Sequence, residues 1–237
     1  MSLKKIVPVE VDSKIDVHEL AEVIVTILDA RDSDTFDHSW RVAALCEEIA
    51  ARMGVPPKWQ DTIHIAAHLH DIGKVGVPDY VLHKKGRLTP KEFLLVQSHS
   101  EIGYNIIHRL PVLNEISLYI LHHHERWDGN GYPSRVSCRD IPLGARIIAV
   151  ADTFDAITTM RPYRTAGSFA EAFCEIKRVA GSQLCPEVAE VFLSMRDSIP
   201  GILEKVRKEI RMKTSHNNTA FNSILPQPDG TILPSRS

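Results

Sequence analysis

The sequence predicts an all-α protein that folds as a single-core helical bundle. Three observations support this class: apolar residues recur at helical spacing along most of the chain, no segment shows a convincing strand pattern, and glycine and proline separate the periodic segments. The 237 residues, 43% of them hydrophobic, are enough for one substantial core. We expect a leader and helix in residues 1–30, the bundle domain in residues 31–197, and a charged helix with a disordered, mobile tail in residues 198–237.

Composition excludes several classes of protein. No apolar run is long enough to span a bilayer, and no signal-peptide core follows the N-terminal lysines, so we expect a cytoplasmic protein without a membrane partner. The four cysteines form no CxxC pair, which favours reduced thiols over disulfides. A net charge of −2 argues against binding to a nucleic-acid polymer. The unusual feature is the content of histidine, with twelve residues.

The first three helices follow from apolar stripes, meaning apolar residues on one helical face. One stripe covers residues 17–28. A second begins one turn after His38 and stops at Gly54 and two prolines. The third helix continues its stripe from Ala66 to His70, so that an imidazole enters the core, and Gly73 ends it. His64 and His68 lie off this stripe, and we expect them at the edge of the core.

The next two helices also carry histidine in their stripes. Thr89 and Pro90 start a helix with His99 in or beside its apolar face. Pro111 opens another helix, in which the spacing directs His123 and His124 inward. Residues 127–133 (WDGNGYP) are rich in turn formers and cannot continue that helix.

The last helices complete the bundle. A helix near Pro142 includes Asp152 in its stripe, and helical periodicity returns in residues 168–180 and 186–195. Residues 202–212 are strongly charged and predict a solvated helix. From residue 214 the chain is polar, contains prolines and has no period, which is typical of a mobile tail.

Five helices therefore place an ionisable group where the stripe demands an apolar one. These groups are His38, His70 with Asp71, His99, His123 with His124, and Asp152. Burying one unsatisfied polar group costs about 1–3 kcal/mol, so five independent occurrences are implausible unless a common partner satisfies them. The His70–Asp71 pair alone is equally compatible with a structural histidine capped by its neighbour. Together, the histidines and carboxylates indicate a catalytic site for two or more metal ions, with Asp71 as the bridge.

Two motifs make the chain resemble a known family. Residues 70–74 (HDIGK) and 123–133 (HHERWDGNGYP) are similar to the HD-GYP family of HD-domain metal phosphohydrolases. The similarity covers residues 17–197 and extends to His38 with Ser39, His99 with Gly103, and residues 150–152 and 161–164. It implies a bundle of the HD-domain type and a cytoplasmic signalling enzyme that hydrolyses cyclic di-GMP to linear pGpG, GMP or both.

The resemblance also implies the metal centre and its ligands. Members use two or three divalent ions, iron or manganese. By position, the ligands are His38, His70, Asp71, His99, His123, His124 and Asp152. Three-metal members carry glutamate where Asp34 stands here. Because aspartate is one methylene shorter, binding of a third ion depends on whether the Asp34 carboxylate reaches it.

Other residues are candidates for contact with the substrate. A hydroxide bridging two metal ions would attack the phosphodiester, with Asp71 between the ions and Lys74 positioned to meet a phosphoryl oxygen or to protonate the leaving oxygen. Lys74 could equally be an ordinary exposed lysine. Arg161 and Arg164 are spaced to bind a second phosphate, or to form a surface ion pair. The loop at Gly131, Tyr132 and Pro133 contacts substrate in the family and a protein partner in some members, or it is only a well-formed turn.

Departures from the family pattern keep other functions open. Residues 134–138 (SRVSC) replace the usual glycines after the GYP motif, which would reshape the loop over the substrate. One alternative is an HD-type phosphohydrolase that acts on another cyclic dinucleotide or nucleotide. A second is a non-catalytic module that senses cyclic di-GMP or binds a partner. The sequence predicts no particular oligomeric state.

Overall fold

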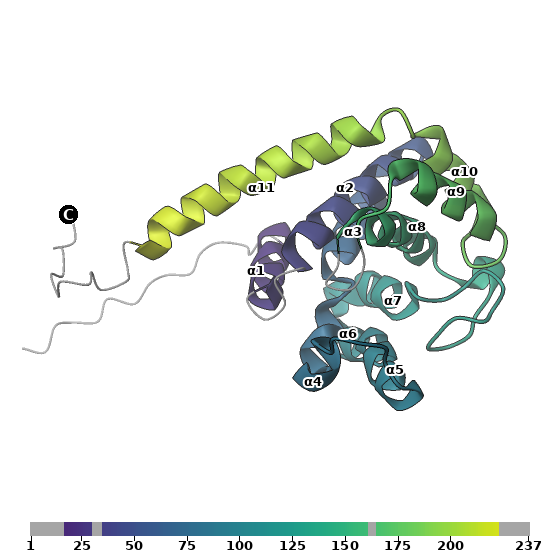
Figure 1. Ribbon diagram of the computed structural model, residues 1–237, viewed down its shortest axis with the longest axis horizontal. Coiled ribbons are helices and arrows are strands. Elements are labelled where there is room, and N and C mark those ends of the chain that lie inside the picture. The colour runs from purple at the N-terminus through teal and green to yellow at the C-terminus, as the bar shows by residue number, and fades with distance from the viewer. Residues whose placement is uncertain (1–16, 30–34, 161–164, 223–237) are drawn as a thin grey trace, which may run out of the picture.

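A computed structural model describes residues 17–29, 35–160 and 165–222 of the chain (Figure 1). Over these ranges it contains helices and loops and no strand, which confirms the predicted all-α class. The α-helices are α1 (Val17–Asp29), α2 (Thr35–Arg52), α3 (Pro57–Leu69), α4 (Asp79–Leu82), α5 (Pro90–Gln97), α6 (His99–Ile107), α7 (Asn114–His122), α8 (Leu143–Thr158), α9 (Phe169–Val179), α10 (Pro186–Ser194) and α11 (Ile199–Asn222). The 3-10 helices are η1 (Ile72–Gly76), η2 (Pro111–Leu113) and η3 (Cys138–Asp140). Among the described helices, none has the length and hydropathy of a membrane span.

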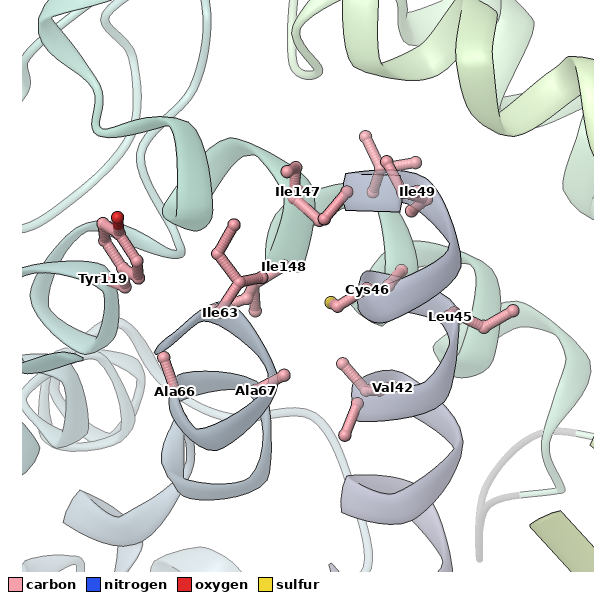
Figure 2. Close-up of a cluster of buried hydrophobic side chains, with 14 of the residues drawn as sticks. Val42, Leu45, Cys46, Ile49, Ile63, Ala66, Ala67, Tyr119, Ile147 and Ile148 are labelled. Carbon is pink, nitrogen blue, oxygen red and sulfur yellow. The ribbon is translucent and has the colours of Figure 1, made fainter. Parts of the chain in front are cut away.

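The centre of the bundle is the packing of α2 against α3 and α8 (Figure 1). Figure 2 shows side chains of α2, including Val42 and Cys46, directed toward Ile63 and Ala67 of α3 and toward Ile148 of α8. All five are at most 1% exposed. Because burial of a large aliphatic side chain contributes about 1.5–3 kcal/mol, this cluster fixes α2, α3 and α8 relative to one another. Each of these helices then delivers a polar residue to the same end of the core.

The predicted helix from Thr89 is divided into two in the structure. Its start is confirmed, because Thr89 caps α5 by accepting a hydrogen bond from the Glu92 backbone, while the Glu92 carboxylate accepts one from the Thr89 backbone. The division falls at Ser98, whose hydroxyl donates to the Leu95 carbonyl oxygen at 2.7 Å. Local hydrogen bonding of this kind bends helices. As a result α6 packs on η1 while none of the residues of α5 is buried.

Other boundaries also differ from the sequence-based expectation. The loop expected over residues 75–88 contains the short helix α4. The final helix α11 continues to Asn222, beyond the start of the expected tail, because adding a residue to an existing helix requires fixing only one more residue for each hydrogen bond gained. The remainder of the tail lies outside the described residues.

Candidate metal centre

The seven side chains predicted as metal ligands lie together at one end of the core. They come from five places in the fold: His38 from α2, His70 and Asp71 from the end of α3, His99 from the first residue of α6, His123 and His124 from the end of α7, and Asp152 from α8. His70, His99 and His123 are each 1% exposed. The helix stripes therefore directed these residues inward as the sequence indicated.

One half of the centre is formed by His38, His70 and the two aspartates. Nε2 of His38 lies 3.3 Å from Nε2 of His70 and 3.4 Å from Oδ1 of Asp152. Oδ2 of Asp71 lies 3.5 Å from Nε2 of His70 and 3.8 Å from Nε2 of His38. One ligand atom each from His38, His70 and Asp71 fall within 4.8 Å of one another, a spacing that one metal ion can span.

The other half is formed by His99, His123 and His124. Nε2 of His99 lies 3.2 Å from Nε2 of His123, and ligand atoms of all three histidines fall within 4.8 Å of one another. The second oxygen of Asp71, Oδ1, lies 3.6 Å from Nε2 of His99. Asp71 therefore directs one carboxylate oxygen to each half, which is the arrangement of a bridging ligand.

Three of the histidines are oriented by the same local hydrogen bond. In each, Nδ1 lies within 2.7 Å of the backbone carbonyl oxygen three residues earlier: His70 with Ala67, His99 with Val96, and His123 with Ile120. A carbonyl oxygen can only accept, so Nδ1 must carry the proton in each neutral ring. Nε2 is then an unprotonated lone pair directed at the centre.

These lone pairs face one another, an arrangement that a cation between them would stabilise. His38 and His70 present Nε2 to Nε2 at 3.3 Å, and His99 and His123 do so at 3.2 Å. Nδ1 of His38 lies 2.7 Å from the Asp155 carboxylate and so carries the proton of that ring, and therefore neither pair can form a hydrogen bond when both rings are neutral. Two nitrogens bound to one ion at about 2.1 Å would lie about 3–3.4 Å apart. The donor set therefore fits divalent metal ions without rearrangement of the rings.

Electrostatics favour the forms that bind metal. Burial lowers the pKa of His123 and His124 well below the usual value, and it also lowers the pKa of His99. Burial would raise the pKa of Asp71, but Lys74 and the neighbouring histidines outweigh it and lower that pKa well below the usual value. At neutral pH these rings are therefore unprotonated and Asp71 is ionised, as metal ligation requires.

Asp155 and Arg41, which were not among the predicted site residues, orient His38. Oδ2 of Asp155 accepts a hydrogen bond from Nδ1 of His38 at 2.7 Å, and Arg41 donates to both carboxylate oxygens of Asp155 at 2.5 and 3.0 Å. Asp155 is 2% exposed. Asp155 could have been identified from the sequence, because it follows Asp152 by three residues and so lies on nearly the same face of α8.

Close backbone packing explains the two glycines beside the ligands. A Cβ atom on Gly73 would overlap the carbonyl oxygen of His99 and lie 2.6 Å from the backbone nitrogen of Gly103. A Cβ on Gly103 would lie 2.8 Å from a methyl carbon of Ile120. Only glycine at these positions allows η1 to approach α6 closely, and that approach brings Asp71 to His99.

The GYP loop, residues 126–135, is held against the centre by Glu125. This buried carboxylate accepts hydrogen bonds from the backbone nitrogens of Ser134 and Arg135 at 2.6 and 2.9 Å. The ring of Tyr132 lies against His124, with centroids 4.9 Å apart. The predicted contact residues Gly131, Tyr132 and Pro133 thus adjoin the second half of the centre.

A cavity of about 720 Å³ opens beside the metal residues. His123, His124 and Asp152 form one part of its lining, and α8, α9 and residues 165–167 form most of the rest. Arg126 and Gln183 also line it, although the sequence analysis did not select them. Such a volume is in the range of small-molecule sites.

The remaining predicted site residues fall in different places. Nζ of Lys74 lies 2.6 Å from Oδ2 of Asp71, and the Lys74 side chain is 26% exposed, so it reaches the centre from its solvent side. Asp34, Arg161 and Arg164 lie outside the described residues. His68 packs edge-on against Trp40, with centroids 4.8 Å apart, and is buried, in contrast to the expectation that it lies at the edge of the core. His64 lies beside it and is partly exposed, as expected.

Comparisons with known proteins agree with this geometry. A family model described as HD domain matches residues 22–188. The chain is 41% identical over 210 residues to a cyclic di-GMP phosphodiesterase of Thermotoga maritima, covering 88% of this chain and 56% of that protein. It is 36% identical over 194 residues to the 3'3'-cGAMP-specific phosphodiesterase 2 of Vibrio cholerae, covering 77% of this chain and 37% of that protein. The chain therefore spans about half or less of the length of these relatives.

A solved structure shares the fold. The crystal structure of a cyclic GMP-AMP specific phosphodiesterase of V. cholerae, V-cGAP3, superposes with a TM-score of 0.59 at 18% identity. The similarity covers 79% of this chain and 50% of that one. At this identity the likeness establishes the arrangement of the helices and nothing about the substrate.

Proposed function

This chain belongs to the HD domain family, and from that membership and its metal centre we propose that it hydrolyses cyclic di-GMP in a reaction that depends on divalent metal ions. The strongest support for the proposal is the arrangement of the histidine nitrogens around Asp71. Two pairs of histidine nitrogens, at 3.3 and 3.2 Å, face each other without a proton to share, and Asp71 lies between the pairs. Two cations, one on each side of Asp71, would satisfy all of these groups.

The donor set favours iron or manganese. Nitrogen and carboxylate ligands without a thiolate suit these ions in a catalytic role, although such ligands also accept zinc. Two ions account for the seven ligands, and a third would require Asp34. Bound divalent ions would activate a water molecule at neutral pH and polarise the phosphodiester.

Several side chains would then act on the substrate. Lys74 is held at Asp71 and is partly exposed, so its ammonium group can donate to a phosphoryl oxygen or supply the proton to the leaving oxygen. The 720 Å³ cavity beside the centre would receive the rest of the dinucleotide. Arg161 and Arg164, close in sequence to its lining, would bind the second phosphate, and the GYP loop would contact the substrate or a protein partner.

A second candidate substrate is 3'3'-cGAMP. Its support is the 36% identity to a V. cholerae enzyme named as specific for that dinucleotide, close to the 41% identity to the T. maritima enzyme. Both molecules present the same type of phosphodiester to the metal ions. The choice between them depends on contacts with the bases, away from the metal centre.

Hydrolysis after controlled metal loading tests the proposal. The protein would be reconstituted anaerobically with iron or manganese and incubated with cyclic di-GMP, and products would be separated by chromatography to distinguish pGpG from GMP. We expect turnover that is lost, together with the metal, in Asp71→Ala and kept in Asp61→Ala, a matched exposed aspartate on α3. Full metal occupancy without turnover would reject this substrate, and retained binding would favour a sensing module.

A further inference from the structure

The wall of the cavity beyond the metal ligands carries hydrogen-bond donors that the metal centre does not use. Arg126 and Gln183 line this wall, and neither is a candidate ligand. Nη1 of Arg126 donates to Oε1 of Gln183 at 3.3 Å. Because arginine offers only donors, the oxygen of the Gln183 amide must face it, and the NH2 group of that amide remains as a further donor.

Arg126 is held in a fixed orientation. Its Nε and Nη2 atoms donate to Oδ1 and Oδ2 of Asp128 at 3.0 and 2.6 Å. Hydrogen bonds from Arg126 lower the pKa of Asp128 to about 2, so this pairing persists throughout the neutral range. The loop itself is attached to the neighbouring turn, because the backbone nitrogens of Trp127 and Asp128 donate to the carbonyl oxygens of Gln183 and Ser182 at 3.0 and 2.8 Å.

Arg126 keeps N–H donors that its protein partners do not use. A guanidinium group has five N–H donors, and the described bonds to Asp128 and Gln183 use three of them. Among the acidic residues in the lining, Glu171 accepts hydrogen bonds from Ser168, Glu175 pairs with Arg178, and Glu125 accepts from the backbone nitrogens of Ser134 and Arg135 through one of its two oxygens. The two N–H donors that Arg126 keeps therefore favour an acceptor on the ligand.

The two purines differ in this respect. Guanine presents two adjacent acceptors, O6 and N7, which match an arginine fork, whereas adenine replaces O6 with an amino group that would meet the donors of Arg126. A site that hydrogen-bonds one group discriminates against an analogue that lacks it, because the donors of the site then lose that partner.

We propose that Arg126, fixed by Asp128 and Gln183, hydrogen-bonds the O6 and N7 edge of a guanine base in the cavity and thereby makes the site selective for guanine over adenine. This inference rests on the proposed function, since it concerns a base of the cyclic dinucleotide. It assigns to Arg126 and Gln183 the choice between substrates that the metal ions cannot distinguish.

Selectivity among three dinucleotides tests the inference. We would measure kcat/KM for cyclic di-GMP, 3'3'-cGAMP and cyclic di-AMP with metal-loaded wild type, Arg126→Met, Gln183→Leu and the control Arg139→Met, an exposed arginine paired with Glu187 outside the cavity. Loss of one bidentate contact should lower kcat/KM for cyclic di-GMP about ten- to hundredfold in Arg126→Met. Activity of Arg126→Met on cyclic di-AMP should not fall, so the preference for guanine disappears. Gln183→Leu should also reduce the preference for guanine.

Binding provides a readout that does not depend on catalysis. Calorimetric titration of the metal-free protein with cyclic di-GMP and cyclic di-AMP should show tighter binding of cyclic di-GMP in wild type and Arg139→Met, and equal binding in Arg126→Met. If wild type hydrolyses none of the three, the proposed function fails, while this binding difference still supports the inference. An equal loss for all three dinucleotides in Arg126→Met, which would indicate a phosphate contact, or no binding preference in wild type, overturns the inference.

Discussion

Asp155 and His38 are 117 residues apart in the sequence, yet Oδ2 of Asp155 accepts a 2.7 Å hydrogen bond from Nδ1 of His38. The other three oriented histidines use a backbone carbonyl of their own chain segment for this purpose. His38 uses a carboxylate from α8 instead. The first half of the centre therefore depends on the packing of α2 against α8.

We predict that Asp155→Asn weakens metal binding. An asparagine amide can donate to Nδ1 and so favour the tautomer of His38 whose Nε2 carries the proton, which directs a hydrogen atom at the metal position. The affinity for manganese should fall about 10–100-fold, as measured by equilibrium dialysis with elemental analysis. Asp140→Asn, an exposed aspartate in η3, should bind as wild type does. Unchanged affinity in Asp155→Asn would show that the hydrogen bond to His38 does not control ligation.

Metal ions should stabilise the fold measurably. A ligand that binds only the native state stabilises it by about 2.7 kcal/mol at one hundred times its Kd, which corresponds to an increase in Tm of about 5–10 °C for a chain of this size. We predict this increase on adding manganese to protein stripped with a chelator, followed by differential scanning calorimetry. Asp71→Asn, which removes the bridging charge at nearly constant shape, should abolish the increase. An equal increase in Asp71→Asn would place the stabilising ion elsewhere.

Lys74→Met should separate catalysis from metal binding. The substitution keeps most of the aliphatic stem and removes the ammonium group, so the metal content should remain that of wild type. If Lys74 supplies a proton or stabilises charge on the phosphoryl group, kcat should fall about 10²–10⁴-fold. Lys85→Met, at an exposed position in the loop before α5, serves as the control. A kcat within twofold of wild type would show that Lys74 is an ordinary exposed lysine with no part in catalysis.

The clustering of the candidate ligands could be predicted from the sequence because the evidence was local. Whether His70 or His123 points inward depends on the phase of its own helix, and a stripe of apolar neighbours reveals that phase. The same reasoning predicted the start of α5 at Thr89, where the capping residue is itself the signal, whereas at Pro111 the structure has the 3-10 helix η2 and α7 begins at Asn114. The seven candidate ligands could therefore be selected before any tertiary contact was known.

The relations that depend on packing could not be predicted in this way. Nothing local to Asp155 identifies His38 as its partner, and nothing local to Arg126 places it beside Gln183, because each pair joins segments brought together only by the fold. The break at Ser98 was missed because the apolar periodicity continues through it, and a local serine hydrogen bond bends the helix without interrupting that pattern. The division of the seven ligands into two halves likewise required the positions of all five helices.

Gly73→Ala should show how closely that packing is tied to the site. The new methyl group would overlap the carbonyl oxygen of His99. Because this oxygen belongs to the backbone and not to a flexible side chain, η1 and α6 must move apart. We predict a loss of stability of about 1–3 kcal/mol, seen as a lower Tm, and weaker manganese binding, because Asp71 precedes η1 and His99 begins α6.

Gly86→Ala is the matched control for Gly73→Ala. A Cβ at Gly86 would meet no atom within 4 Å, so the substitution should leave manganese binding unchanged and be neutral or stabilise the protein by up to about 1 kcal/mol through the unfolded state. A Gly73→Ala variant with the Tm and metal affinity of wild type would mean that η1 can separate from α6 at little cost. In that case the distance between Asp71 and His99 would be set by the metal ions and not by the close approach of two backbones.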